Sequence, residues 1–157
     1  MYTITKKYKD FPAAHRQHRH DGHCAHVHGH NWSFEFTFAS DHLDENGFVM
    51  DFGKMRFIKD WLTEMFDHTL LINENDPEAR FFLDHHIGGG KRLWDVRIIP
   101  NGSAEDLAQY VWMNISDITQ DVWNEEGYEG PCPELISVTV YEDDKNCATF
   151  IKPSDND

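Results

Sequence analysis

The sequence predicts an α+β fold in which an antiparallel β-sheet carries two helices on one face. Segments in which apolar and polar residues alternate lie at both ends of the chain, and two stretches with helical spacing lie between them. The predicted strands are residues 2–9, 28–39, 134–142 and roughly 147–152. The resulting order, strand–strand–helix–helix–strand–strand, is typical of an antiparallel sheet covered by helices.

The two N-terminal strands are expected to pair as a long hairpin around a polar, histidine-rich loop at 16–27. Tyr2, Ile4 and Tyr8 share one parity, and the first strand is expected to end near Pro12, which cannot donate to a β-ladder. In the second strand the even positions are aromatic and the odd positions polar, which predicts one buried face. These even positions are Trp32, Phe34, Phe36 and Phe38.

Two amphipathic helices are predicted between the strand pairs. Asp51 is the expected N-cap of the first helix, which ends near Phe66. Ser103 caps the second helix, with Asp106 as its capping-box partner. Their apolar stripes are Met55, Ile58, Leu62 and Met65 in the first, and Leu107, Val111, Ile115 and Ile118 in the second.

The segments between these elements are less regular. Residues 70–72 lead to a polar turn at 73–77, and residues 78–90 are expected to form a short helix or loop that closes on three glycines. A short strand is expected at 93–99. A loop that contains Gly127, Gly130, Pro131 and Pro133 precedes the last two strands.

Length and composition predict one domain in a reducing compartment. The chain has 157 residues, which we expect to form a single domain at 1–153 with a loose tail at 154–157. The net charge of −14 argues against a nucleic-acid partner. Three cysteines form no paired framework, and neither a signal peptide nor a transmembrane run is visible, so we expect a cytoplasmic protein.

Seven of the eleven histidines lie between residues 15 and 30, and this cluster predicts a metal site. His28 and His30 are two apart in a predicted strand and therefore point to the same face, at the start of its apolar side. Two imidazoles at that position are costly to bury unless a metal satisfies them. A catalytic zinc typically takes three protein ligands, and His15 is the third candidate. Spacing alone leaves open whether other histidines of the loop take part.

Glu142 continues the parity of the buried face of the strand at 134–142. A carboxylate at that position either marks where the strand reaches solvent or serves as a buried acceptor. An ionised carboxylate accepts two parallel hydrogen bonds from a paired N–H edge, such as that of a pterin or a guanine.

Cys24, Asp67 and His68 are candidates for proton transfer. A carboxylate beside an imidazole can orient it and raise its pKa, which makes a proton donor. A thiol near a metal can become a thiolate. Each feature alone also fits a bystander: an Asp-His pair at a helix end is often only a cap or an exposed surface.

Six blocks of sequence, taken together and in order, resemble the 6-pyruvoyl-tetrahydropterin synthase superfamily, and in particular its 6-carboxy-tetrahydropterin synthase branch. The blocks are F-P-A-A-H at 11–15, C-A-H-V-H-G-H-N at 24–31, V-M-D-F at 49–52, F-D-H-T-L-L-I-N at 66–73, S-A-E-D-L-A at 103–108 and V-T-V-Y-E at 138–142. The resemblance implies the tunnelling fold, in which the sheets of several subunits close into a barrel. It also implies a homohexamer of two trimers with active sites between subunits.

The resemblance implies a role for each candidate residue. His15, His28 and His30 match the zinc ligands, and Glu142 matches the carboxylate that grips the pterin ring. Cys24 matches the proton-shuttling thiol. Asp67 and His68 match the dyad that handles the proton on the other side.

The implied reaction converts 7,8-dihydroneopterin triphosphate to 6-carboxy-5,6,7,8-tetrahydropterin, with release of acetaldehyde and triphosphate, in the 7-deazapurine (queuosine) route. Cys24 lies four residues before His28, the spacing of the carboxy-forming enzymes. Two alternatives stay open: a 6-pyruvoyl-tetrahydropterin synthase, which stops before carbon–carbon cleavage, and a non-catalytic pterin-binding member of the fold. A metal-dependent hydrolase is disfavoured because no H-E-x-x-H pattern is present.

Overall fold

The computed structural model describes residues 1–125 and 132–154. Its elements are β1 (Tyr2–His15), η1 (His23–Ala25), β2 (His28–Ser40), η2 (Phe52–Met55), α1 (Arg56–Phe66), β3 (Thr69–Asn73), α2 (Ala79–Asp84), β4 (His86–Ile87), β5 (Lys91–Arg92), β6 (Val96–Ile99), α3 (Ala104–Glu125), β7 (Glu134–Tyr141) and β8 (Cys147–Ile151). The predicted loop residues Gly127, Gly130 and Pro131, and residues 155–157 of the predicted tail, lie outside the described residues.

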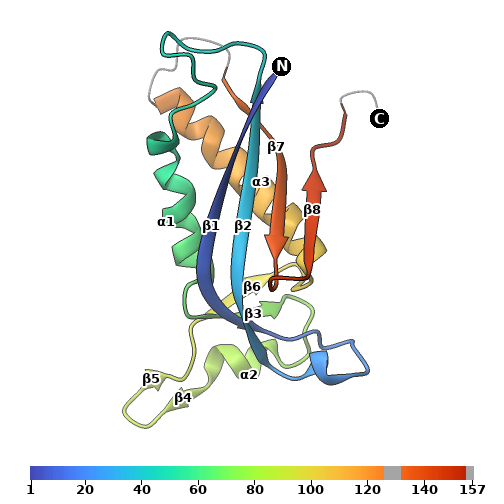
Figure 1. The fold of residues 1–157 in the computed structure, drawn as a ribbon. Coiled ribbons are helices and arrows are strands. Elements are labelled where there is room, and N and C mark those ends of the chain that lie inside the picture. The colour runs from blue at the N-terminus through green and yellow to red at the C-terminus, as the bar shows by residue number, and fades with distance from the viewer. Residues whose placement is uncertain (126–131, 155–157) are drawn as a thin grey trace.

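A six-stranded sheet in the order β6-β3-β1-β2-β7-β8 forms the framework, with α1 and α3 on one side of it (Figure 1). The four strands β1, β2, β7 and β8 are antiparallel, which confirms the predicted α+β class. The strand β3 was not predicted, and it pairs in parallel with β1 and β6. Its first four residues are all buried, so the alternation that reveals a one-sided strand is missing.

The strand β1 extends to His15, beyond the predicted end near Pro12. The carbonyl of Pro12 accepts a hydrogen bond from the backbone N–H of His68 at 2.8 Å. The nitrogen and carbonyl of one residue in a strand face the same neighbour, so the missing N–H of Pro12 faces away from β2. Pairing with β3 begins only at Ala13. The proline therefore interrupts neither ladder.

A β-bulge between Tyr8 and Phe11 changes which side chains of β1 point inward. Tyr8 pairs with Phe34 and Phe11 pairs with Trp32, so two residues of β1 face one residue of β2. Asp10, in the bulge, has a positive φ of 69°. Before the bulge the inward residues have even numbers, and after it they have odd numbers. As a result His15 is buried on the same side as Phe11 and Ala13.

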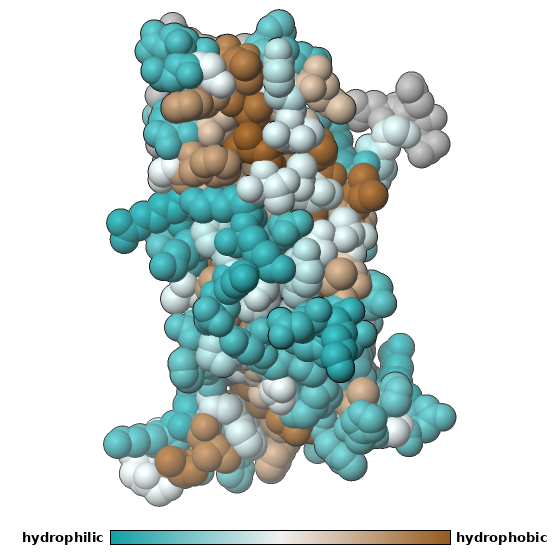
Figure 2. Space-filling view, viewed as in Figure 1, coloured by the Kyte–Doolittle hydropathy of each residue, from teal (hydrophilic) through white to brown (hydrophobic). Residues whose placement is uncertain are grey.

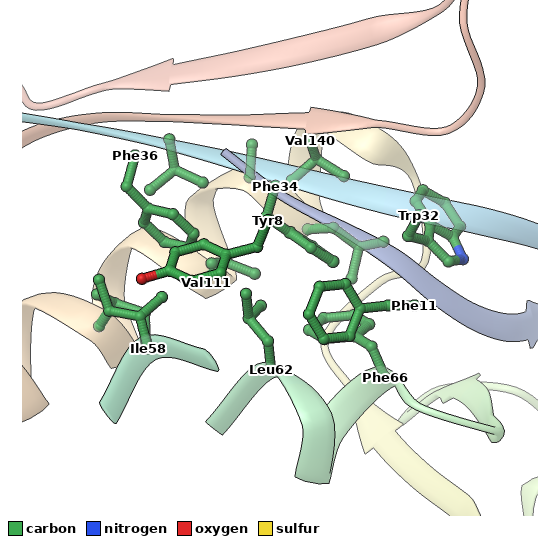
Figure 3. Packing of buried hydrophobic residues seen from close by; sticks show 14 of the residues in the cluster. Tyr8, Phe11, Trp32, Phe34, Phe36, Ile58, Leu62, Phe66, Val111 and Val140 are labelled. Atoms are coloured by element: carbon green, nitrogen blue, oxygen red, sulfur yellow. The ribbon is translucent and has the colours of Figure 1, made fainter. Parts of the chain in front are cut away.

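The core lies between the sheet and the two long helices (Figure 3). The aromatic residues predicted for β2 are fully buried, and they pack with Ile58, Leu62 and Phe66 of α1 and Val111 of α3. The predicted cap of α3 is present, since Ser103 Oγ accepts from Asp106 N at 3.2 Å. Asp51 caps η2 rather than α1: its carboxylate accepts from Gly53 N at 2.7 Å, and η2 leads directly into α1.

A small second core sits at the end of the sheet where the histidine-rich loop leaves β1 (Figure 1). Leu70, Ile72 and Phe82 are buried there, with Trp94 packed against them. The predicted short helix is α2, and the three glycines turn the hairpin β4–β5. Among the residues that the structure describes, none of the helices has the length and apolar content of a membrane span.

Candidate metal centre

Three histidines converge at the end of the β1–β2 hairpin. His15 and His28 are register partners across the two strands, and His30 follows two residues later on the same face of β2. Their ring centroids lie 4.5 Å apart for His15 and His28, and 5.0 Å apart for each of the other two pairs. The structure thus brings together the three residues that the sequence predicted as metal ligands.

Backbone carbonyls orient two of the three rings. His15 Nδ1 donates to the Gly102 carbonyl at 2.8 Å, and His28 Nδ1 donates to the His26 carbonyl at 2.8 Å. A carbonyl can only accept, so each Nδ1 carries the hydrogen and each Nε2 presents a lone pair when the ring is neutral. These two Nε2 atoms lie 3.0 Å from each other. Two facing lone pairs repel unless a cation lies beside them.

Glu142 completes the cluster from the end of β7. Its Oε1 atom lies 3.0 Å from His30 Nε2 and 3.7 Å from His15 Nε2. One ligand atom from each of the three histidines and from Glu142 lies within 4.8 Å of the others. The structure therefore places Glu142 beside the candidate metal ligands.

Burial keeps two of the imidazoles neutral. It lowers the pKa of His15 to about 4, and the hydrogen bond to Gly102 opposes this shift only in part. It also lowers the pKa of His30, although the charge of Glu142 opposes the shift. Both rings are thus uncharged at pH 7, the form that binds metals.

The donor set fits zinc. Zinc–nitrogen bonds of about 2.0–2.1 Å at tetrahedral angles separate two nitrogen ligands by roughly 3.3 Å, close to the observed separation of His15 and His28 Nε2. The Nε2 atom of His30 is buried and, among the described residues, has no hydrogen-bond partner. A metal ion would satisfy it.

Cys24 lines the same cavity as His15 and His28. It lies in η1, is half-buried, and borders a cavity of about 720 Å³ together with His15, His28 and Glu142. Arg19 and Lys145 also line this cavity, and sequence reasoning did not identify either. Their positions depend on two separate loops meeting in space, which no local spacing reveals. His30 and Glu142 also line a second cavity of about 520 Å³, which Lys7 and Lys9 border.

Asp67 and His68 form a pair on a different surface. His68 Nδ1 lies 2.6 Å from Asp67 Oδ1, and the His68 side chain is 82% exposed. His68 has a positive φ of 59°, at the junction of α1 and β3. Neither residue lines the cavity that contains Cys24. Within one chain, the structure does not bring the dyad to the thiol.

A buried ion pair supports the loop that follows His15. Arg16 Nε lies 2.9 Å from Asp76 Oδ2, and the Asp76 side chain is fully buried. His18 Nδ1 lies 4.0 Å from Asp76 Oδ2, whereas His20 lines the cavity that contains Cys24. Sequence analysis placed Asp76 in a polar turn and missed this role, because 60 residues separate the partners.

Comparisons with known proteins agree on one family. The family model described as 6-pyruvoyl tetrahydropterin synthase matches residues 3–153. The protein named 6-carboxy-5,6,7,8-tetrahydropterin synthase of Rickettsia bellii is 38% identical over 103 residues, which cover 65% of this chain and 72% of that protein. The protein of the same name from Aquifex aeolicus is 33% identical over 122 residues, which cover 76% and 70% of the two chains.

Solved structures show the same fold. An uncharacterized protein from Wolinella succinogenes matches with a TM-score of 0.79 at 18% identity and covers 97% of this chain and 98% of that one. The 6-pyruvoyl tetrahydropterin synthase of Caenorhabditis elegans matches with a TM-score of 0.61 at 21% identity and covers 98% of each chain. The match to the family model over nearly the whole length confirms the resemblance noted from the sequence blocks. The chain belongs to the 6-pyruvoyl tetrahydropterin synthase family.

Proposed function

We propose that the protein is a zinc-dependent lyase that converts 7,8-dihydroneopterin triphosphate to 6-carboxy-5,6,7,8-tetrahydropterin. Acetaldehyde and triphosphate would be released, and the product would enter the 7-deazapurine (queuosine) route. One observation carries the proposal: three histidines converge with Glu142, and two of them, His15 and His28, share a cavity with Cys24. The names of the Rickettsia bellii and Aquifex aeolicus relatives support the carboxy-forming branch.

We assign the metal to His15, His28 and His30. Their donor atoms and the neutrality of the His15 and His30 rings match what zinc requires. Zinc held there would act as a Lewis acid toward the oxygens of the substrate side chain.

The remaining site residues would handle protons and hold the ring. Cys24 lines the cavity, and we propose that it takes up a proton as a thiolate and releases it as a thiol. The Asp67 carboxylate orients the His68 ring through its Nδ1 atom, which leaves Nε2 to exchange a proton. Glu142 would accept paired hydrogen bonds from the N–H edge of the pterin.

We propose that the active form is a homohexamer of two trimers with active sites between subunits. The exposed position of Asp67 and His68, away from Cys24, supports a site that a second copy completes. Apolar residues gather at the upper end of the molecule in Figure 2. The exposed Tyr2, Leu43 and Phe48 line a further cavity. Such surfaces are typical of protein contacts.

We also infer a cytoplasmic location, supported by the cysteines. Cys24 and Cys147 are free cysteines. Proteins of oxidising compartments commonly use paired cysteines as cross-links, whereas reduced thiols are typical of the cytoplasm.

A product assay tests the reaction. Zinc-loaded protein is given 7,8-dihydroneopterin triphosphate, and the products are identified by mass spectrometry, with Cys24→Ala and Glu142→Ala as variants. We expect acetaldehyde and a 6-carboxy product from the wild type and neither from the variants. A 6-pyruvoyl product would instead indicate a 6-pyruvoyl-tetrahydropterin synthase. No turnover by folded, zinc-loaded protein would overturn the assignment and leave a pterin-binding role.

A further inference from the structure

Asp76 is a buried carboxylate in the turn between β3 and α2, and it lines neither of the two cavities at the metal centre. Its side chain is fully buried, and nearby backbone groups hold it in place. Asp76 Oδ1 accepts from the Glu78 N–H at 2.9 Å, and the Asp76 N–H donates to the Asn73 carbonyl at 2.9 Å. Because these bonds use only Oδ1 and the backbone, Oδ2 is a fixed negative charge that faces the histidine-rich loop.

Arg16 and His18, from the start of that loop, point to this carboxylate. Arg16 Nε lies 2.9 Å and His18 Nδ1 lies 4.0 Å from Asp76 Oδ2. The guanidinium carbon of Arg16 also lies 5.8 Å from the centre of the Phe82 ring in α2. The Arg16–Asp76 contact is an ion pair without a hydrogen bond, since Nε and Oδ2 each lack a hydrogen-bond partner among the described residues. Charge therefore holds Arg16 against the β3–α2 segment.

The side chains at the start of the loop divide between Asp76 and the cavity. Gln17 and Arg19 line the cavity that contains Cys24, whereas Arg16 and His18 do not. The side chains at 16 and 18 thus turn toward Asp76, and those at 17 and 19 turn the other way. Holding the first two on the buried carboxylate keeps the other two in the cavity wall.

Gln17 connects this anchor to Cys24. The backbone N–H of Gln17 donates to the Cys24 carbonyl at 2.8 Å. Since Gln17 directly follows Arg16, one peptide bond and one hydrogen bond join the ion pair to the residue that carries the thiol. A displacement of about 1 Å can cost a catalytic group roughly 100-fold in rate, so a small movement of Arg16 would matter at Cys24.

We propose that Asp76 is a positioning residue for Cys24, and that it acts through Arg16 and the backbone of Gln17. The inference rests on the proposed role of Cys24 in proton transfer. It adds that a carboxylate outside the cavity determines where the thiol lies. A buried ion pair is often no more stabilising than apolar side chains of the same size. What the Arg16–Asp76 pair supplies is one defined position for the start of the loop.

Paired substitutions of the two charges test the inference. Asp76→Asn removes one charge and keeps an acceptor for the Glu78 N–H, Arg16→Gln removes the other charge, and a double variant lacks both. The matched control is Asp84→Asn, because Asp84 lies in α2 and its ion pair with Arg80 is exposed. For each protein, kcat, KM and bound zinc per chain are measured. Hydrogen exchange is followed by mass spectrometry in peptides from 16–27 and 32–40.

We expect each single variant to lower kcat roughly 10- to 100-fold, to change KM less than kcat, and to keep one zinc per chain. The amides of 16–27 should exchange faster than in the wild type, whereas those of 32–40, in β2, should be unchanged. The double variant should lose no more activity than either single variant, because both residues act through one contact. Asp84→Asn should match the wild type in every measurement.

Three results would overturn the positioning role of Asp76. They are wild-type kcat and loop exchange in Asp76→Asn, a loss of kcat in the double variant equal to the product of the single losses, and equally faster exchange in 16–27 and 32–40. If Asp76→Asn does not fold, the double variant, which leaves no unpaired charge there, is compared with the wild type instead. Absence of turnover in the wild type would overturn the proposed function alone, and exchange in 16–27 would still decide whether Asp76 holds the loop.

Discussion

The Nε2 atoms of His15 and His28 lie 3.0 Å apart, and the Nδ1 atom of each ring is held by a backbone carbonyl. Neither ring can turn its Nδ1 toward the cluster without losing that hydrogen bond. The two lone pairs are therefore aimed at one point before any metal arrives. Such preorganisation lowers the cost of binding, because little side-chain freedom is left to lose.

Zinc binding should depend strongly on His28. We expect one zinc per chain in the wild type, and for His28→Ala a loss of affinity greater than the roughly 10- to 100-fold that outer-shell changes cost. At a zinc concentration of a thousand times Kd, the metal adds about 4 kcal/mol to the unfolding free energy of the wild type. Calorimetry and thermal unfolding with and without chelator measure both effects. His23→Ala, in the loop that precedes β2, is the control, and equal zinc affinity in the two variants would contradict the assignment.

Cys24 and His68 should complement each other from different copies. We expect Cys24→Ala and His68→Ala to be inactive separately while retaining zinc. When the two variants are unfolded together and refolded as mixed oligomers, about a quarter of the sites between subunits should contain both native residues. Activity assays before and after mixing test this expectation. If mixing restores nothing although mixed oligomers form, the site does not combine these residues from two chains.

Removal of Asp76 should cost far more stability than removal of an exposed partner. Asp76→Ala leaves Arg16 without its counter-charge in a largely buried site, and we expect a loss of about 3–5 kcal/mol in unfolding free energy. The control is Asp84→Ala, which breaks the exposed pair of Arg80 and Asp84 and should cost less than about 1 kcal/mol. Urea unfolding compares the two. Similar losses would show that the Arg16–Asp76 pair is not a buried support of the loop.

The free energy of unfolding should fall at alkaline pH because of Tyr8. Burial raises the pKa of Tyr8 well above its usual value of 10, and its hydroxyl donates to the Met55 carbonyl at 2.8 Å. Above pH 10 the unfolded chain releases this proton while the folded protein keeps it. The unfolded state then binds fewer protons, so the unfolding free energy falls as the pH rises.

Tyr8→Phe separates this effect from general alkaline unfolding. At pH 8 the variant should lose about 1 kcal/mol, the net value of one hydrogen bond. Between pH 9 and 11 its stability should decline less steeply than that of the wild type, as followed by urea midpoints. A residual slope is expected, since burial also raises the pKa of Tyr110. Identical slopes for the wild type and Tyr8→Phe would refute the assignment.

The parts of the fold with one buried face were predictable from the sequence. Alternation in β2 located the core aromatics, and the parity of His28 and His30 predicted that both point to one face. The strand β3 was not predicted because it is buried on both faces and its sequence shows no alternation. The roles of Lys145 and Asp76 were not predicted for another reason. Contacts between segments far apart in the chain bring Lys145 to the cavity and Asp76 to Arg16.

The bulge at Asp10 decides where β1 tolerates a change in length. Two residues of β1 face one residue of β2 there, so removing one of them would leave Tyr8 and Phe11 two positions apart, as in a regular strand. Phe11, Ala13 and His15 would then keep their inward faces. Removing one residue between Phe11 and His15, where the alternation is regular, would instead turn His15 to the opposite face of the sheet. In evolutionary terms, related chains should vary in length at residues 9 and 10 more freely than between Phe11 and His15.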